Sequence, residues 1–175
     1  ILLGPRQFIE ATHLERGGLD FQWTTKLEDR ERLWEARHQA FYAALALRPG
    51  AQGWTTDVCV PISRLVECIT ETKKANATAT FPITLASHAG DGNFHLIYVL
   101  DPTSETELAQ ARDLNARMVE LALSMGGTCT GEHGVGYGKM KYLAAEHGAS
   151  LEVMRTIKRA LDPDNRMNPG KMVTF

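Results

Sequence analysis

Two extended apolar segments, separated by a polar turn, constrain the fold of this chain more than any other feature. Residues 81–87 and 94–100 have the composition of β-strands, and two glycines between them give the backbone the freedom that a tight turn needs. This pattern predicts an antiparallel hairpin. His88 and His95 flank the turn, and we expect them to lie nearly opposite each other on one face, with Cβ atoms about 5 Å apart.

The remaining chain alternates helical and extended patterns. Apolar residues recur at helical spacing in five segments: residues 26–47, a segment that Ser63 caps, residues 104–125, a short segment near 139–146, and the segment that starts at Ser150. Residues 21–23 and 54–60 have β-rich composition. The mixture predicts an α+β domain, in which helices pack mainly on one face of an antiparallel sheet. We expect residues 1–175 to form a single domain.

Two of these helices have a defined apolar face. In the helix after Ser63 we expect Leu65, Val66 and Ile69 to point inward. In the last helix the corresponding face carries four apolar residues, Leu151, Met154, Ile157 and Leu161. Both faces are therefore predicted to contribute to one core.

Composition excludes several classes of function. A net charge of −2 gives no electrostatic reason to bind nucleic acid or an anionic membrane. No apolar run is long enough to span a bilayer, and no leader pattern opens the chain. The three cysteines have no C-x-x-C spacing, which favours a reducing compartment. Because the sequence begins at Ile1, we expect it to be part of a larger protein.

Two histidines and a carboxylate are a common ligand set of open zinc sites, which keep one position for water or substrate. Together with Glu132, the histidines of the turn could form such a site. The alternative is a polar hairpin with two partly exposed imidazoles and no metal, and the sequence leaves both open. His133 directly follows Glu132, so in extended backbone the two side chains leave on opposite sides. We assign Glu132 to the metal and His133 to a general base.

Three further features have competing interpretations. Arg37 lies within an apolar helical stripe, where it either extends to solvent or grips a substrate carboxylate with its forked guanidinium. Cys129 is either a soft metal ligand or a small buried thiol. The glycines before Lys139 superficially resemble a phosphate loop, but the pattern requires glycine where His133 stands and Ser or Thr where Met140 stands.

Three motifs, in this order, resemble the C-terminal domain of FAD-linked oxidases of the vanillyl-alcohol oxidase type: HAGDGNFH at 88–95, TCTGEHGVG at 128–136 and MNPGK at 167–171. The resemblance runs from about Leu19 to Val173. It is greatest to the D-2-hydroxyacid dehydrogenases, the branch that includes cytochrome-type D-lactate dehydrogenase and the FAD subunit of glycolate oxidase. It implies a ferredoxin-like α+β substrate or cap domain. Such a domain packs on an N-terminal FAD-binding domain, absent from this chain, so the chain alone would be inactive.

The resemblance also implies roles for individual residues. It places the metal ligands at His88, His95 and Glu132, and the catalytic base at His133. The other implied contacts are with substrate or flavin: Arg37 with the substrate carboxylate, Asn93 near substrate or flavin, and Asn168 and Lys171 near the flavin. The ligand set suits zinc, with manganese and iron also chemically admissible.

The segment 54–58 lacks the extra lysine that the dicarboxylate-using branch tends to carry. A small 2-hydroxy acid such as D-lactate or glycolate is therefore expected as substrate, rather than 2-hydroxyglutarate. The electron acceptor stays open and a homodimer is admissible. A bacterial cytoplasm, with or without membrane association, and a mitochondrion both fit. The alternatives to an FAD-dependent dehydrogenase are a metal-dependent hydrolase and a noncatalytic ligand-binding module.

Overall fold

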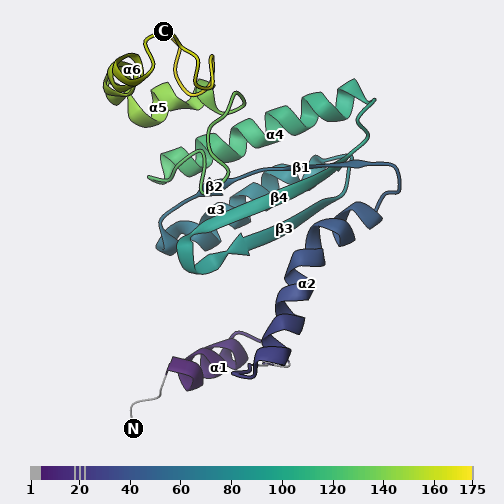
Figure 1. Cartoon of the computed structure of the whole chain (residues 1–175). Coiled ribbons are helices and arrows are strands. Elements are labelled where there is room, and N and C mark those ends of the chain that lie inside the picture. Colours follow the sequence, from purple (N-terminus) through teal and green to yellow (C-terminus); the bar gives the residue numbers. More distant parts are fainter. Residues whose placement is uncertain (1–4, 18, 20, 22, 175) are drawn as a thin grey trace. The chain divides into compact units, whose positions relative to one another are not determined.

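A computed structural model of the chain describes residues 5–17, 19, 21 and 23–174 (Figure 1). These residues fall into two units that divide between Gln39 and Ala40. The first unit contains α1 (Pro5–Glu15) and the beginning of α2 (Leu27–Ala46), which confirms the helix predicted over 26–47. Phe21 and Trp23 are not in a strand, contrary to the prediction for 21–23, and Gln22 lies outside the described residues.

The second unit combines a small antiparallel sheet with helices that lie between its strands and after them in the chain. Its elements after α2 are β1 (Gln52–Thr55), β2 (Val58–Cys59), α3 (Ile62–Ala75), η1 (Asn76–Thr78), β3 (Ile83–His88), η2 (Ala89–Asp91), β4 (Asn93–Leu100), α4 (Glu105–Ser124), η3 (Met140–Tyr142), α5 (Leu143–His147) and α6 (Ser150–Leu161). The predicted helices over 104–125 and from Ser150 are thus confirmed. Ser63 lies inside α3, whose N-cap is Pro61, and caps nothing.

Strand β4 is the centre of the sheet. β3 pairs along one edge of β4, and β1 and β2 pair along the other in a single register, with Thr55 opposite Ile97 and Val58 opposite Phe94. β1 and β2 are therefore one extended segment that is interrupted at residues 56–57. After α4 the chain returns to this segment through an antiparallel bridge between Cys59 and Thr128. The resulting order of elements and pairings is ferredoxin-like, and the predicted α+β class is confirmed.

The hairpin is present, but its register differs from the prediction. His88 lies opposite Asn93 and His95 opposite Ala86, so the two histidines are not opposed. The reason is the short loop: the 3₁₀ turn η2 and Gly92, whose φ is 75°, close the hairpin within four residues. Because side chains on one strand alternate between faces, a two-residue offset still leaves both histidines on the same face.

The core lies against both faces of β4, all eight residues of which are buried. On one face Phe94, Leu96 and Tyr98 pack with apolar residues of α3 and α4, and on the other Ile97 and Val99 pack with Ala44 at the end of α2. Figure 1 shows α3 and α4 side by side on the same face of the sheet. This burial fixes β4 rigidly, and β4 carries His95.

The inward faces of α3 and α6 differ from prediction in part. Val66 is 76% exposed, whereas Cys68 and Thr72, which share the spacing of Leu65, are buried. On α6, Leu151 is buried but Ile157 and Leu161 are exposed.

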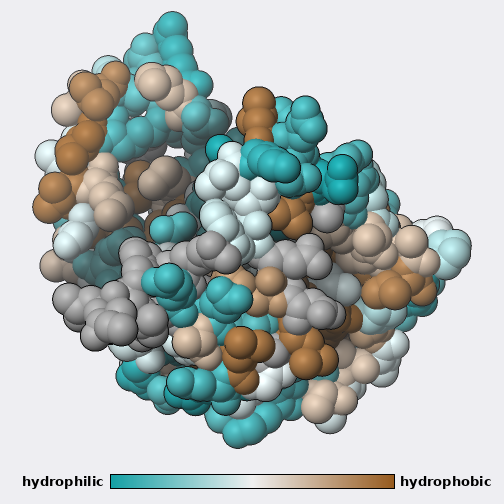
Figure 2. Space-filling model, turned by 90° about the horizontal axis from the view of Figure 1, so that it is seen from below, coloured by the Kyte–Doolittle hydropathy of each residue, from teal (hydrophilic) through white to brown (hydrophobic). Residues whose placement is uncertain are grey.

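Apolar residues also occur at several separate places among polar ones on the face shown in Figure 2. Among the described residues, no helix has the length and apolar character that crossing a membrane requires.

Gly92 is expected to be essential to the hairpin. A Cβ at this position would lie 2.0 Å from the carbonyl oxygen of Val60, and the positive φ disfavours any other residue. We expect Gly92→Ala to lower the free energy of unfolding by about 3 kcal/mol or more, measured by urea titration.

Gly90→Ala is the matched control in the same turn, because nothing lies within 4 Å of its added Cβ. It should change stability by less than about 1 kcal/mol. Equal losses in the two variants would contradict the turn geometry.

Candidate metal centre

His88 and His95 come from the two strands of the hairpin and differ in exposure. His88 ends β3 and its side chain is 37% exposed, whereas His95 lies within β4 and its side chain is 5% exposed. Their ring centroids are 5.8 Å apart, with the ring planes nearly perpendicular. The buried imidazole is fixed by the core, and the exposed one lies beside it at the end of the strand.

Glu132 brings a carboxylate to the two imidazoles from a distant loop. Its Oε1 lies 2.8 Å from Nε2 of His95 and 3.5 Å from Nε2 of His88. One ligand atom from each of the three residues lies within 4.8 Å of the others. Atoms that share a zinc ion at bonds of 2.0–2.2 Å are separated by about 3–4 Å. The arrangement therefore fits a divalent cation after small side-chain adjustments.

The orientation of His95 also suits metal binding. Its Nδ1 lies 3.0 Å from the backbone carbonyl oxygen of Thr56, which only a protonated Nδ1 can satisfy. In the neutral imidazole Nε2 then carries the lone pair, and among the described residues it has no hydrogen bond of good geometry. Two acceptor atoms, Nε2 and the Glu132 oxygen, thus lie in close contact, an arrangement that a cation between them stabilises.

The loop that carries Glu132 is held by a buried carboxylate, that of Asp57, in the interruption between β1 and β2. The Asp57 side chain is 1% exposed. Its Oδ2 accepts hydrogen bonds from three successive backbone N–H groups, those of Gly131, Glu132 and His133, at 2.9, 3.1 and 3.0 Å. The loop therefore curls around one oxygen atom.

Further donors complete the environment of this carboxylate. Thr130 Oγ1 and Lys139 Nζ donate to Oδ2, at 2.9 and 3.2 Å, and Asn93 Nδ2 donates to Oδ1 at 2.8 Å. Burial alone would raise the pKa of Asp57, but the hydrogen bonds from His133, Asn93 and Thr130, together with the charge of Lys139, hold it well below the usual range. Asp57 is consequently a permanent anion at neutral pH.

His133 lies beside the three clustered groups rather than across the loop from them. Its ring stacks on that of His95, with centroids 4.9 Å apart and planes 12° from parallel. Its Nε2 is 3.6 Å from Oε1 of Glu132. The expectation that the two side chains leave on opposite sides was wrong, because the loop is curled around Asp57 and is not extended. One carboxylate oxygen thus faces three imidazole nitrogens.

Asn93 is placed differently from a typical substrate ligand. It is 5% exposed, and its Nδ2 donates to Asp57 and to the carbonyl oxygen of Val58. A Cβ on Gly131 would lie 2.0 Å from this Nδ2, so the loop approaches Asn93 as closely as only glycine allows. The first glycine of the Gly-Glu-His-Gly motif is explained by this contact, and the role of Asn93 near substrate or flavin stays a prediction.

Asn168 and Lys171 line a groove that begins next to the His133 loop. Its volume is about 500 Å³, and its walls are residues 134–136, one face of α6, and residues 167, 168 and 171–173. Lys171 Nζ lies 5.4 Å from the ring centroid of Tyr137, and the backbone of Asn168 has a φ of 48°. These two residues share one surface.

The three clustered residues do not include three other candidates from the sequence, Arg37, Lys139 and Cys129. Arg37 belongs to the first unit and is half-buried. Lys139 donates to Asp57, which gives this lysine a structural partner in place of a phosphate. Cys129 is buried outside the cluster, and burial and then the neighbouring Glu146 raise the pKa of its thiol to about 12. The interpretation of Cys129 as a small buried thiol fits this environment.

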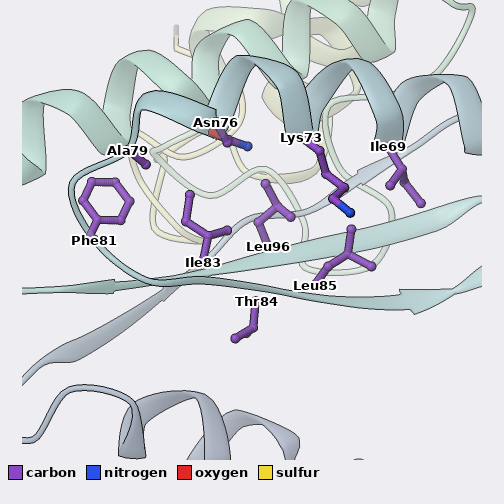
Figure 3. A pocket seen from close by; sticks show the side chains of 9 residues that line it. All are labelled: Ile69, Lys73, Asn76, Ala79, Phe81, Ile83, Thr84, Leu85 and Leu96. Carbon is purple, nitrogen blue, oxygen red and sulfur yellow. The ribbon is translucent and has the colours of Figure 1, made fainter.

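A separate hollow of about 440 Å³ lies between α3 and the sheet. Figure 3 shows Ile69 and Lys73 of α3 facing Ile83 and Leu85 of β3, with Thr84 pointing away. None of the predicted site residues lines it. The chemistry is therefore to be sought at the imidazole cluster.

Sequence reasoning missed Asp57 and Thr56 as parts of the site. Their signal is the polar Thr-Thr-Asp step within an otherwise β-rich stretch, just before Val58. Thr56 fills the interruption of the strand, since its Oγ1 accepts from the N–H of Leu96 and its own N–H donates to the carbonyl oxygen of Leu96. Polar residues that break a strand pattern without turn residues mark such a position.

Residues 5–172 match the family described as FAD linked oxidases, C-terminal domain. The chain belongs to this family. The resemblance seen in the three motifs is thereby confirmed.

The relatives are dehydrogenases and oxidases. A Danio rerio protein named probable D-lactate dehydrogenase, mitochondrial, is 50% identical over 160 residues, which are 91% of this chain and 32% of that protein. D-lactate dehydrogenase [cytochrome], mitochondrial, of Arabidopsis thaliana is 46% identical, over 95% of this chain and 30% of the relative. Glycolate oxidase subunit GlcD of Escherichia coli K12 is 29% identical, over 91% of this chain and 32% of the relative. The chain spans about a third of the length of these relatives.

The tautomer of His95 is directly measurable. We expect its Nδ1 to carry the proton in the metal-free chain at neutral pH, because the Thr56 carbonyl accepts it. Long-range ¹H–¹⁵N correlation spectra distinguish the two ring nitrogens, and the partly exposed His147 serves as the reference. Spectra in which Nε2 of His95 carries the only proton would contradict this orientation.

Proposed function

We propose that this chain is the substrate- and metal-binding domain of an FAD-dependent D-2-hydroxyacid dehydrogenase. The reaction oxidises a small 2-hydroxy acid, D-lactate or glycolate, to the 2-oxo acid. The observation that carries the proposal is the convergence of His88, His95 and Glu132, with His133 stacked beside them, in a member of the FAD-linked oxidase family. FAD would be bound mainly by an N-terminal domain of the same protein.

The three clustered side chains are proposed to hold one divalent cation, zinc in the first place and manganese or iron as alternatives. Their donor set is chemically suited to it, and the Thr56 carbonyl keeps the lone pair of His95 Nε2 directed at the cluster. A cation held there would supply Lewis-acid polarisation of the substrate hydroxyl group, which would lower the pKa of that hydroxyl. Glu132 adds the negative charge that favours a divalent ion.

His133 is proposed to take the hydroxyl proton at its Nε2. This nitrogen lies 3.6 Å from the Glu132 oxygen, so it faces the space in which the substrate hydroxyl would lie. Stacking on the buried His95 ring restricts the His133 ring to this position. The carboxylate of Glu132 stabilises the imidazolium that forms, because the opposite charges are close together.

The remaining roles concern binding. Arg37 is proposed to grip the substrate carboxylate, for which its planar guanidinium is suited, and Asn93 to lie near substrate or flavin. Asn168 and Lys171 are proposed to approach the flavin through the groove along α6. A bound FAD would supply the two-electron acceptor for the hydride that leaves Cα of the substrate.

The choice of substrate rests on charge. No lysine occurs in residues 54–58, and Lys139 is held by Asp57. A second carboxylate on the substrate would thus lack a cation in this segment, which favours D-lactate or glycolate over a dicarboxylate.

The names of the Danio and Arabidopsis relatives favour a mitochondrial location over a bacterial one. Family membership also favours the dehydrogenase over a metal-dependent hydrolase or a noncatalytic module.

The test of the proposed base is His133→Ala in a polypeptide that joins this chain to its FAD-binding domain. We expect kcat for D-lactate to fall by about 10²- to 10⁴-fold, because the hydroxyl proton loses its acceptor. Metal content should stay unchanged, since His133 is not among the proposed ligands.

His147→Ala is the matched control, a partly exposed histidine that lies outside the cluster. It should retain full activity. Turnover of the His133 variant within a few-fold of the parent would remove His133 from the mechanism.

A further inference from the structure

Asp57 is a buried charge to which the proposed mechanism assigns no role. Its side chain is 1% exposed, so it cannot meet substrate. Its Oδ1 lies 3.7 Å from Nδ1 of His95, on the side of the ring remote from the cluster. Burying an anion so completely is costly, and the cost is offset only by the donors that surround it. The position of those donors shows what the charge is used for.

Four of the donors to Asp57 belong to residues 130–133, the segment that carries Glu132 and His133. Successive N–H groups that converge on one oxygen form an anion-binding nest, here filled by a carboxylate of the same chain. Glu132 and His133 contribute two of these three N–H groups. Their backbone positions are therefore fixed by the same atom, although the loop has neither helix nor strand to support it.

The opposite side of the cluster depends on the same interruption between β1 and β2. The carbonyl of Thr56 orients the His95 ring, and the next residue, Asp57, holds the Glu132 loop. Oδ1 of Asp57 also accepts from Asn93, the first residue of β4. Thr56 and Asp57 thus together set the distance between β4, which carries His95, and the loop that carries Glu132.

The geometry points to Asp57 as the positioning residue of the site: it holds Glu132 and His133 in place against the imidazoles of the hairpin. It acts through these residues and touches neither metal nor substrate. This inference rests on the proposed function, because it concerns how the same site is assembled. It predicts that removal of the Asp57 charge weakens metal binding more than removal of another carboxylate charge elsewhere in the fold.

The test compares zinc affinity in the 175-residue chain and its variants, measured by competition with a chromophoric chelator. Asp57→Asn should weaken zinc binding by about 10- to 100-fold, the range usual for residues that support metal ligands. Thr130→Val removes a single donor to Oδ2 and should give a smaller loss in the same direction. Circular dichroism shows whether Asp57→Asn folds. If it does not fold, the zinc affinity of Thr130→Val tests the inference instead.

Glu107→Gln is the matched control. Glu107 is a half-buried carboxylate that accepts from Arg48 and from the N–H of Asp101, beyond the far end of β4. We expect it to lose stability in urea while zinc affinity stays at the level of the parent chain. Parental zinc affinity in folded Asp57→Asn, or in Thr130→Val when Asp57→Asn is unfolded, would overturn the inference and leave Asp57 a merely structural residue.

Hydrogen exchange separates this inference from the proposed function. If the parent chain binds no zinc, the metal part of the proposed function fails. The amides of residues 131–133 then decide the inference. They should exchange slowly in the parent and in Glu107→Gln, and much faster in Asp57→Asn and Thr130→Val. Fast exchange of these amides in the parent chain would show that Asp57 does not hold the loop at residues 131–133.

Discussion

The hydrogen bonds between the buried carboxylate of Asp57 and the loop at 131–133 are the interaction on which the site depends. A glycine-rich loop has no repeating backbone pairing, so the N–H groups that it turns inward need an acceptor from elsewhere. Asp57 provides that acceptor from the edge of the sheet. The loop is thereby attached to the most rigid part of the fold, next to β4, and the Glu132 carboxylate meets the imidazoles as a consequence.

The same interaction explains why the motif around Glu132 contains these particular residues. Gly131 must lack a side chain because Asn93 lies against it, and Thr130 and Lys139 are donors to the Asp57 carboxylate. What resembles a degenerate phosphate loop is instead a loop wrapped around an internal anion. The positive charge of Lys139 compensates the buried negative charge, so the exposed Glu132 carboxylate is left to face the histidines.

Local features of the sequence were sufficient for much of this structure. Apolar spacing predicted α2, α4 and α6 to within a few residues, and the turn between two apolar segments predicted the hairpin, because both signals are short-range. The predicted cluster of His88, His95 and Glu132 followed from the types of residue, and the family resemblance strengthened it. The register of the hairpin was not predictable in the same way, since it depends on how few residues the 3₁₀ turn needs. Asp57 was missed because its function lies in tertiary contacts with residues about 75 positions away. The polar Thr-Thr-Asp step marks an interruption of the strand, but it does not show which groups the carboxylate binds.

The most direct test of the account is the location of the metal by anomalous diffraction from crystals of the zinc-loaded chain, collected on both sides of the zinc absorption edge. The account predicts one strong anomalous peak, within about 2.0–2.2 Å of Nε2 of His88, Nε2 of His95 and a carboxylate oxygen of Glu132. A peak bound by other residues, or the absence of an ordered peak at these three side chains, would contradict it.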